Sequence, residues 1–193
     1  MFDYIIEKIK KKELIYKPYC HLYIEDLLSD DHFSSIVSAR EINIPTANCD
    51  ADLFKSLFER GYKIIPFPGC IENEKKYIKW HKFKKKKLWN TESSCESSGV
   101  TLRLKKPETE IIIKLKNFLA SDEFNLAIAE KFGFQLSDTY LDNGIQKYLD
   151  GYEISPHPDS KVKAATFMIN INPHKNSESL IHHTHYLKTK NEF

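Results

Sequence analysis

The 193-residue chain has little arginine, although it carries 29 basic residues in all. Its arginines are Arg40, Arg60 and Arg103, so lysine supplies nearly all of the positive charge. Phosphate recognition favours the planar, bidentate guanidinium of arginine over the lysine ammonium. With a formal net charge of only +2, the composition does not indicate a protein whose main task is to bind nucleic acid.

Closely spaced cysteines and long apolar runs are also missing. Cys20, Cys49, Cys70 and Cys95 form no C-x-x-C pair, which argues against a zinc knuckle or a redox dithiol. We expect these thiols to be reduced. No segment approaches the ~18 consecutive apolar residues of a membrane span, and the N-terminus lacks the pattern of a signal peptide. The sequence therefore predicts a cytoplasmic protein.

Helical periodicity dominates the first two-thirds of the chain. Ser29 is a good N-cap for a helix that follows the short strand-like stretch at 21–24, and Asp50 and Gly61 bound a second helix at 51–60. Pro107 opens a helix over 107–120. Ser121 and Gly133 bound a fourth helix, "DEFNLAIAEKF".

The period changes to two in the last third of the chain. Strands are predicted at 145–154, 164–173 and 180–187, and an earlier one in "GVTLRL". Helices followed by strands indicate an α+β fold with an antiparallel sheet or barrel. We expect a single domain over 1–193, with helical support at about 20–135 and barrel strands at about 140–190.

The segment "DGYEISPHPDS" carries the clearest chemical signal. His157 and Asp159 are two residues apart, so in an extended chain they point to the same face. Pro156 and Pro158 fix the φ angles around them and hold the segment extended. An imidazole and a carboxylate are two-thirds of the ligand set that binds non-haem ferrous iron. The alternative is a surface turn in which the histidine bonds to a neighbouring residue.

Residues on both sides of this pair extend the pattern into a resemblance. The stretch resembles the prolyl-4-hydroxylase-like branch of the 2-oxoglutarate and Fe(II)-dependent dioxygenases. Upstream, "HLYIEDLLSDDHFSSIV" is similar to the opening strand and helix of that family, and "NFLASDEFNLAIAEKFG" to the helix pair before its barrel. The resemblance thus covers most of 18–187, weakly at 61–106. The residues around the H-x-D pair that carry it are Tyr148, Gly151, Tyr152, Lys161, Lys163 and Asn172.

The resemblance implies a fold, a reaction and a role for one tyrosine. The fold is a double-stranded β-helix, or jelly-roll, supported by helices. The cofactor is Fe(II), and 2-oxoglutarate is the cosubstrate that is decarboxylated to succinate while a small-molecule or peptide substrate is oxidised. Tyr148 is then expected to face the cosubstrate. Otherwise Tyr148 lines the barrel or the core, as strand tyrosines often do.

The family pattern is incomplete here. It requires a distal histidine as third metal ligand and, about ten residues later, an arginine or lysine for the cosubstrate. Only 34 residues follow Asp159, which is too few for the remaining strands of an eight-stranded barrel. His185, or His183 on the same face, is the candidate third ligand, with Lys188 or Lys190 as the anion partner. The chain is thus expected to be an oxygenase or a truncated, non-catalytic relative.

Two further expectations concern partners. An incomplete barrel leaves an open strand edge, which is a template for self-association. The stretch 75–89 interleaves lysines with Tyr77, Trp80, Phe83 and Trp89, a pattern that also suits single-stranded nucleic acid. The simpler interpretation is a solvated loop or helix face, because most charge runs are of that kind.

Overall fold

The computed structural model describes residues 1–83, 95–159 and 162–173. This part of the chain contains six α-helices and short antiparallel strands, an α+β fold. It divides into two compact units. The helical unit comprises Met1–Ile42, Glu108–Asn143 and the described residues from 162 onward, and the sheet unit comprises Asn43–Pro107 and Gly144–Asp159. Within the described residues, no helix has the length and apolarity needed to cross a bilayer.

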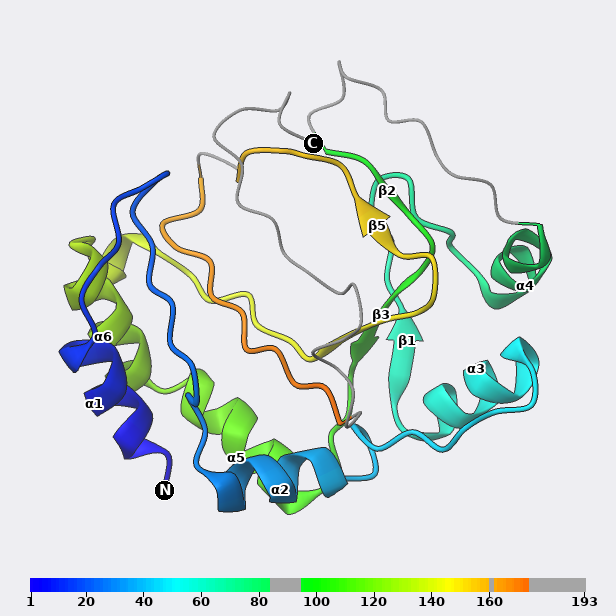
Figure 1. The fold of residues 1–193 in the computed structure, drawn as a ribbon, viewed down its shortest axis with the longest axis horizontal. Helices are drawn as coiled ribbons and strands as arrows, with labels where there is room; N and C mark the ends of the chain where they lie inside the picture. Colours follow the sequence, from blue (N-terminus) through cyan, green and yellow to red (C-terminus); the bar gives the residue numbers. More distant parts are fainter. Residues whose placement is uncertain (84–94, 160–161, 174–193) are drawn as a thin grey trace. The chain divides into compact units, whose positions relative to one another are not determined.

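Four helices build the helical unit: α1 (Asp3–Lys11), α2 (Asp30–Ser38), α5 (Glu110–Leu119) and α6 (Asp122–Phe132). Helix α1 packs beside α6, and α2 beside α5 (Figure 1). A short 3-10 turn, η1 (Leu136–Asp138), follows α6. The core lies between the helices, and its largest fully or almost fully buried side chains are Phe2, Ile5, Ile36, Ile112, Leu115 and Phe124.

The capping predictions for two of these helices are confirmed. The Ser29 hydroxyl accepts a hydrogen bond from the His32 amide at the start of α2, and the Ser121 hydroxyl accepts one from the Phe124 amide at the start of α6. Gly133 ends α6 with a φ of 73°, a left-handed conformation that glycine adopts without steric cost.

Helix α5 is capped differently from the prediction. It begins at Glu110 instead of 107, and its N-cap Thr109 makes no capping bond through its own side chain. The carboxylate of Glu41, which is 1% exposed, accepts hydrogen bonds from the Glu108 amide (2.7 Å), the Thr109 amide (2.8 Å) and the Thr109 hydroxyl. A distant residue therefore satisfies amide groups that a helix start leaves without intrahelical partners.

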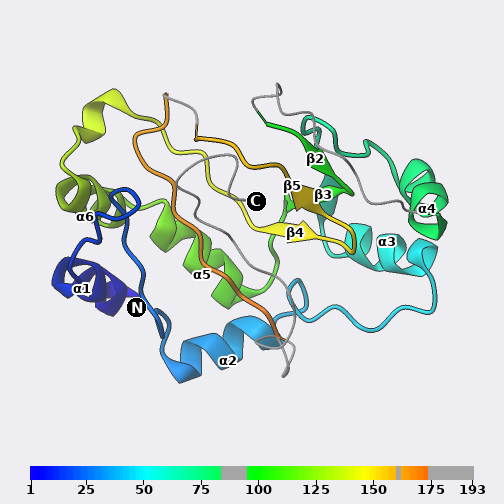
Figure 2. The same ribbon diagram turned by 45° about the horizontal axis from the view of Figure 1, so that its top comes forward.

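The sheet unit contains helices α3 (Asp50–Glu59) and α4 (Glu74–Lys82) and five short strands. The strands are β1 (Tyr62–Ile64), β2 (Ser97–Ser98), β3 (Thr101–Leu104), β4 (Gln146–Tyr148) and β5 (Glu153–Ile154). They form an antiparallel sheet in the order β1-β3-β4 and a separate antiparallel β2-β5 pair. Figure 2 shows β4 beside β3.

The pleat of the three-stranded sheet gathers apolar side chains on one face, which also receives Lys147, the partner of Leu102 in the β3–β4 ladder. Tyr62, Leu102 and Leu104 lie on one face and are at most 5% exposed. Because neighbouring residues along a strand point to opposite faces, the register places the alternating residues on the other face. We call this second set the polar face: Lys63, Thr101, Arg103, Gln146 and Tyr148.

Several strand predictions differ from the structure. The strand expected at 145–154 is two strands, β4 and β5, because a turn with Gly151 at a φ of 78° interrupts it. Residues 164–173 contain no strand, although Phe167, Ile169 and Ile171 alternate in exposure with their neighbours. Only an isolated bridge between Ile15 and His21 represents the strand expected at 21–24. The strand predicted at 180–187 lies outside the described residues.

Helix α4 is held by a histidine between two carboxylates. His81 Nδ1 lies 2.8 Å from the Asp50 carboxylate at the start of α3, and His81 Nε2 lies 2.8 Å from that of Asp150 in the β4–β5 turn. One turn earlier, the hydroxyl of fully buried Tyr77 donates to the Asp150 carbonyl. These bonds connect α4 to two distant segments of the sheet unit.

Replacing Glu41 by alanine is expected to lower the free energy of unfolding by about 1.5–3 kcal/mol at pH 7, the range for hydrogen bonds to a charged group. Burial raises the pKa of Glu41, but the bonds from the Thr109 hydroxyl and the two amides outweigh it and lower the pKa. The stabilisation is therefore present above the unfolded-state pKa and is lost as pH falls through the folded-state pKa. Urea unfolding between pH 7 and pH 3 measures this.

Glu108→Gln is the matched control for this variant. The Glu108 carboxylate forms an exposed ion pair with Arg40, so its loss is expected to cost below about 1 kcal/mol. An alanine variant at Glu41 that is as stable as wild type at pH 7 would contradict the capping role.

Stability should depend on the charge of His81. The hydrogen bond to Asp150, and then that to Asp50, raises the pKa of His81 above its ordinary value of 6.5. The charged form thus stabilises the fold below pH 6.5, and this contribution is lost as pH rises through the higher folded-state pKa. We expect His81→Gln to destabilise by about 1 kcal/mol at pH 5.5 and by less at pH 9. Tryptophan fluorescence in urea measures both, with Lys79→Gln on the same helix as control.

Candidate metal site at the end of strand β5

The predicted metal ligands follow β5 in the sheet unit. The segment from Ser155 to Asp159 continues from this strand without belonging to one. Ser155 is 4% exposed and is bonded twice to Glu96: its amide donates to the Glu96 carbonyl (2.7 Å), and its hydroxyl accepts from the Glu96 amide (2.9 Å). The backbone is therefore anchored two residues before His157.

His157 is half-buried and makes a defined backbone contact. Its Nδ1 lies 2.7 Å from the carbonyl oxygen of Ser155. A carbonyl only accepts hydrogen bonds, so in the neutral imidazole Nδ1 carries the proton and Nε2 keeps its lone pair. This is the arrangement of metal-binding histidines, in which a backbone carbonyl commonly orients the ring.

The partner carboxylate, Asp159, is exposed, as is Pro158 between the two residues. No group of three or more histidine, cysteine, aspartate or glutamate side chains in the described ranges is arranged to hold a metal. The candidate third ligand His185 and its alternative His183 lie outside those ranges, as do Lys188 and Lys190.

Tyr148, the predicted cosubstrate residue, lies on β4 and on the polar face. Its ring is half-exposed and stacks on Tyr152 with the centroids 4.1 Å apart and the planes 17° from parallel. Its hydroxyl donates to the side-chain oxygen of Gln146. Burial raises the pKa of Tyr148, while a hydrogen bond with Tyr152 and the charge of Arg103 partly offset the rise. Tyr148 is therefore a half-open polar residue and is not part of the core.

A cluster of small polar side chains next to these tyrosines was not predicted. The thiol of Cys70 lies 2.9 Å from the hydroxyl of Ser97 and 3.4 Å from that of Thr101. Ser97 in turn donates to the Pro68 carbonyl. These residues are far apart in sequence, so only the alternation in "GVTLRL", which places Thr101 and Arg103 on one face, offered a signal.

The basic stretch at 75–89 is partly described. Tyr77 is 1% exposed and its ring packs edge-on against Phe54 at 5.4 Å, so it is a core residue and not a platform for bases. Phe83 is 77% exposed. The lysines at 84–87, which are half of the lysines in this run, lie outside the described residues.

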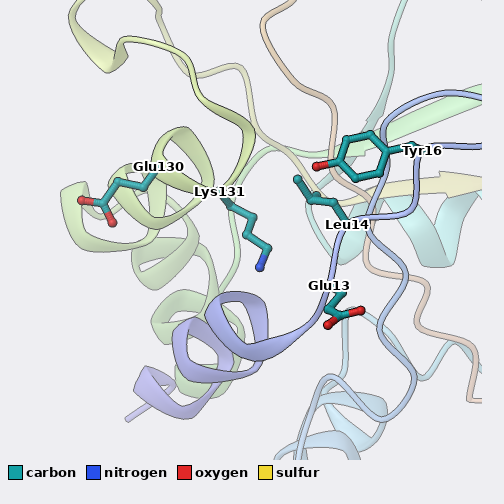
Figure 3. A pocket seen from close by; sticks show the side chains of 5 residues that line it. All are labelled: Glu13, Leu14, Tyr16, Glu130 and Lys131. Carbon is teal, nitrogen blue, oxygen red and sulfur yellow. The ribbon is translucent and has the colours of Figure 1, made fainter.

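A surface hollow of about 440 Å³ lies in the helical unit (Figure 3). Its lining consists of Glu13, Leu14, Tyr16, Glu130 and Lys131. It is open to solvent, and its charged side chains are of both signs. None of the residues predicted from the sequence as site residues lines it, so it is not the candidate site.

Comparison with known proteins identifies no relative of this chain. No protein-family model matches the chain, and no curated protein or solved structure is significantly similar to it. The function of the site therefore has to be inferred from the residues of this chain alone.

The tautomer of His157 is directly measurable. We expect the neutral ring to be protonated at Nδ1, because only an N–H can donate to the Ser155 carbonyl. Long-range ¹H–¹⁵N correlation spectra at pH 8 distinguish the two tautomers. His21, whose Nδ1 lies 2.9 Å from the Tyr19 carbonyl, is a reference with the same local bond. A spectrum with Nε2 protonated in His157 would contradict the assignment.

Proposed function

We propose that the chain is an Fe(II) and 2-oxoglutarate-dependent oxygenase of the prolyl-4-hydroxylase-like kind, or a non-catalytic relative of one. His157 and Asp159 are its first two metal ligands. The observation that carries the proposal is the bond from His157 Nδ1 to the Ser155 carbonyl, because it leaves Nε2 as the metal-binding nitrogen.

The donor set fits ferrous iron. One imidazole nitrogen and one carboxylate oxygen are members of the two-histidine, one-carboxylate triad, which leaves coordination positions open for reactants. When bound, the iron supplies the oxygen chemistry of the reaction. The protein's contribution is to place the two donors and to bind the reactants next to them.

The backbone limits the cost of bringing the two donors to one ion. Pro156 and Pro158 restrict φ on both sides of His157, which reduces the freedom lost on binding. Ser155, bonded twice to Glu96, anchors the start of this segment. Ligands that are already in position raise the affinity for a metal, because the chain loses less conformational entropy when the metal binds.

The remaining parts of the proposal concern the barrel and the third ligand. We propose that β4 and β5 are early strands of a jelly-roll, with Tyr148 on the face toward the cosubstrate. His185 is the proposed third ligand. Short antiparallel strands joined by tight turns are compatible with this architecture, and β4 is an edge strand among the described ones, so self-association through that edge is part of the proposal.

Anaerobic titration with Fe(II) tests the metal site. We expect His157→Ala and Asp159→Ala each to weaken binding about 10- to 100-fold, because each removes one donor from a two- or three-donor site. His21→Ala is the matched control, since that histidine makes the same backbone bond but has Tyr23 where an aspartate would be needed. Equal Fe(II) affinity in wild type and His157→Ala would reject the assignment.

Succinate formation from 2-oxoglutarate separates the oxygenase from the non-catalytic relative. The assay requires no knowledge of the prime substrate, because these enzymes commonly decarboxylate the cosubstrate slowly without it. Iron-dependent succinate that is lost in His157→Ala supports the oxygenase. Fe(II) binding without succinate supports the relative.

A further inference from the structure

Helix α4 presents a row of lysines to the solvent. The helix packs against α3 (Figure 2) and buries Tyr77, while Lys75, Lys79 and Lys82 are exposed. Residues three and four positions apart on a helix are neighbours on one face, so these three side chains follow one another along two turns. We call Lys75, Lys79 and Lys82 the lysine strip.

Neighbouring acids do not neutralise the lysine strip. Within the described part of the chain, none of its three ammonium groups forms an ion pair. The nearby carboxylate of Glu72 lies 3.8 Å from the ammonium group of Lys76 instead. Asp50 and Asp150 lie on the packed side of α4, where both are bonded to His81. The strip is therefore complementary to an anionic partner.

The stability of the helix does not account for the whole strip. Lys79 and Lys82 lie in the last turn of α4, where the helix dipole favours positive charge. Lys75 lies in the first turn, where the dipole disfavours it. Lys75 and Lys79 also repel each other, because like charges four residues apart destabilise a helix. An anionic partner would offset both effects.

An exposed aromatic side chain lies beside the strip. Phe83 directly follows α4, is 77% exposed and comes four residues after Lys79, on the same side of the helix. Trp80 is only half-exposed, and its ring lies 5.7 Å from that of Tyr77 and stacks on His81. Phe83 thus adds an open apolar group to the charges, whereas Trp80 is partly covered by rings of its own helix.

We propose that the lysine strip and Phe83 bind the anionic surface of a lipid bilayer, with α4 lying along the headgroups. Acidic lipids attract basic side chains on one face of a helix. An exposed phenylalanine can enter the boundary between headgroups and acyl chains. Such binding is peripheral and requires no membrane-spanning helix. It goes beyond the proposed function, since it needs neither iron nor 2-oxoglutarate.

A single-stranded nucleic acid, the other polyanion that the sequence suggests, fits this surface less well. Bases stack on exposed aromatic rings, but Tyr77 is buried and Trp80 is partly covered. Phosphate recognition also favours arginine, and residues 75–89 contain no arginine. A bilayer surface requires only positive charge and an apolar side chain that can insert, and the strip and Phe83 supply both.

Co-sedimentation of the full chain with vesicles tests the proposal. The vesicles contain phosphatidylcholine and about 30% phosphatidylserine, in about 0.1 M salt, where exposed charges are screened beyond ~10 Å. We expect binding that is absent with phosphatidylcholine alone. Lys75→Gln/Lys79→Gln/Lys82→Gln should weaken it about 100-fold, because each lysine near an anionic surface contributes about fivefold. Glutamine and lysine have similar helix propensities, so α4 should persist, as checked by circular dichroism.

A second set of three lysines provides the matched control. Lys10→Gln/Lys11→Gln/Lys12→Gln removes the same charge from exposed residues of the helical unit. We expect it to weaken vesicle binding by no more than about twofold, because charges away from the contact are screened. Phe83→Ala keeps every charge and should weaken binding a few fold. A variant with arginine at all three strip positions should bind as wild type does, since its charge is unchanged.

The outcomes separate this proposal from its alternatives. Phosphatidylserine-dependent binding that is lost in the lysine-strip variant and retained in the control supports it. Absence of binding by wild type overturns it, as does equal binding by a folded lysine-strip variant or equal weakening by both triple variants. Binding to oligothymidine that is stronger than vesicle binding and is lost with the strip lysines overturns the assignment to lipid. None of these results depends on Fe(II), so a failure here is distinguishable from a failure of the proposed function.

Discussion

The hydrogen bond between the His157 imidazole and the Ser155 carbonyl is the contact on which the metal proposal depends. The two residues are only two positions apart in sequence. The position of the Ser155 carbonyl, however, is fixed by a residue far away in the sequence, because Ser155 is bonded twice to Glu96. Strand β2, which follows Glu96, pairs with β5. The orientation of one ring is thus determined by a β-ladder between segments more than fifty residues apart.

The sheet unit shows how a small sheet serves a core and a site together. Strand pleating sends Leu102 and Leu104 to the buried face and Thr101 and Arg103 to the polar face. Burial of the apolar face stabilises the strands. The side chains of the polar face therefore do not need to be apolar for the sheet to form. Gly144 then allows the Arg103 side chain to lie close to the backbone.

The parts of the fold that were predicted from sequence are those that local interactions decide. Ser29 and Ser121 bond to amides three residues ahead, and Gly133 ends a helix through its own φ. Contacts across long sequence separations were not predicted. Glu41 caps a helix 67 residues away, and His81 joins Asp50 to Asp150. Nothing in the neighbouring sequence specifies such partners, because they are brought together only by folding.

The same division holds for the candidate site. The sequence alone determined which donors are present, namely an imidazole and a carboxylate two residues apart between prolines, since residue type and spacing are local properties. Only the tertiary structure decided which nitrogen of His157 is left to bind and that Arg103 shares a face with Tyr148. Both depend on strand register, and a shift of one residue would turn every side chain to the opposite face.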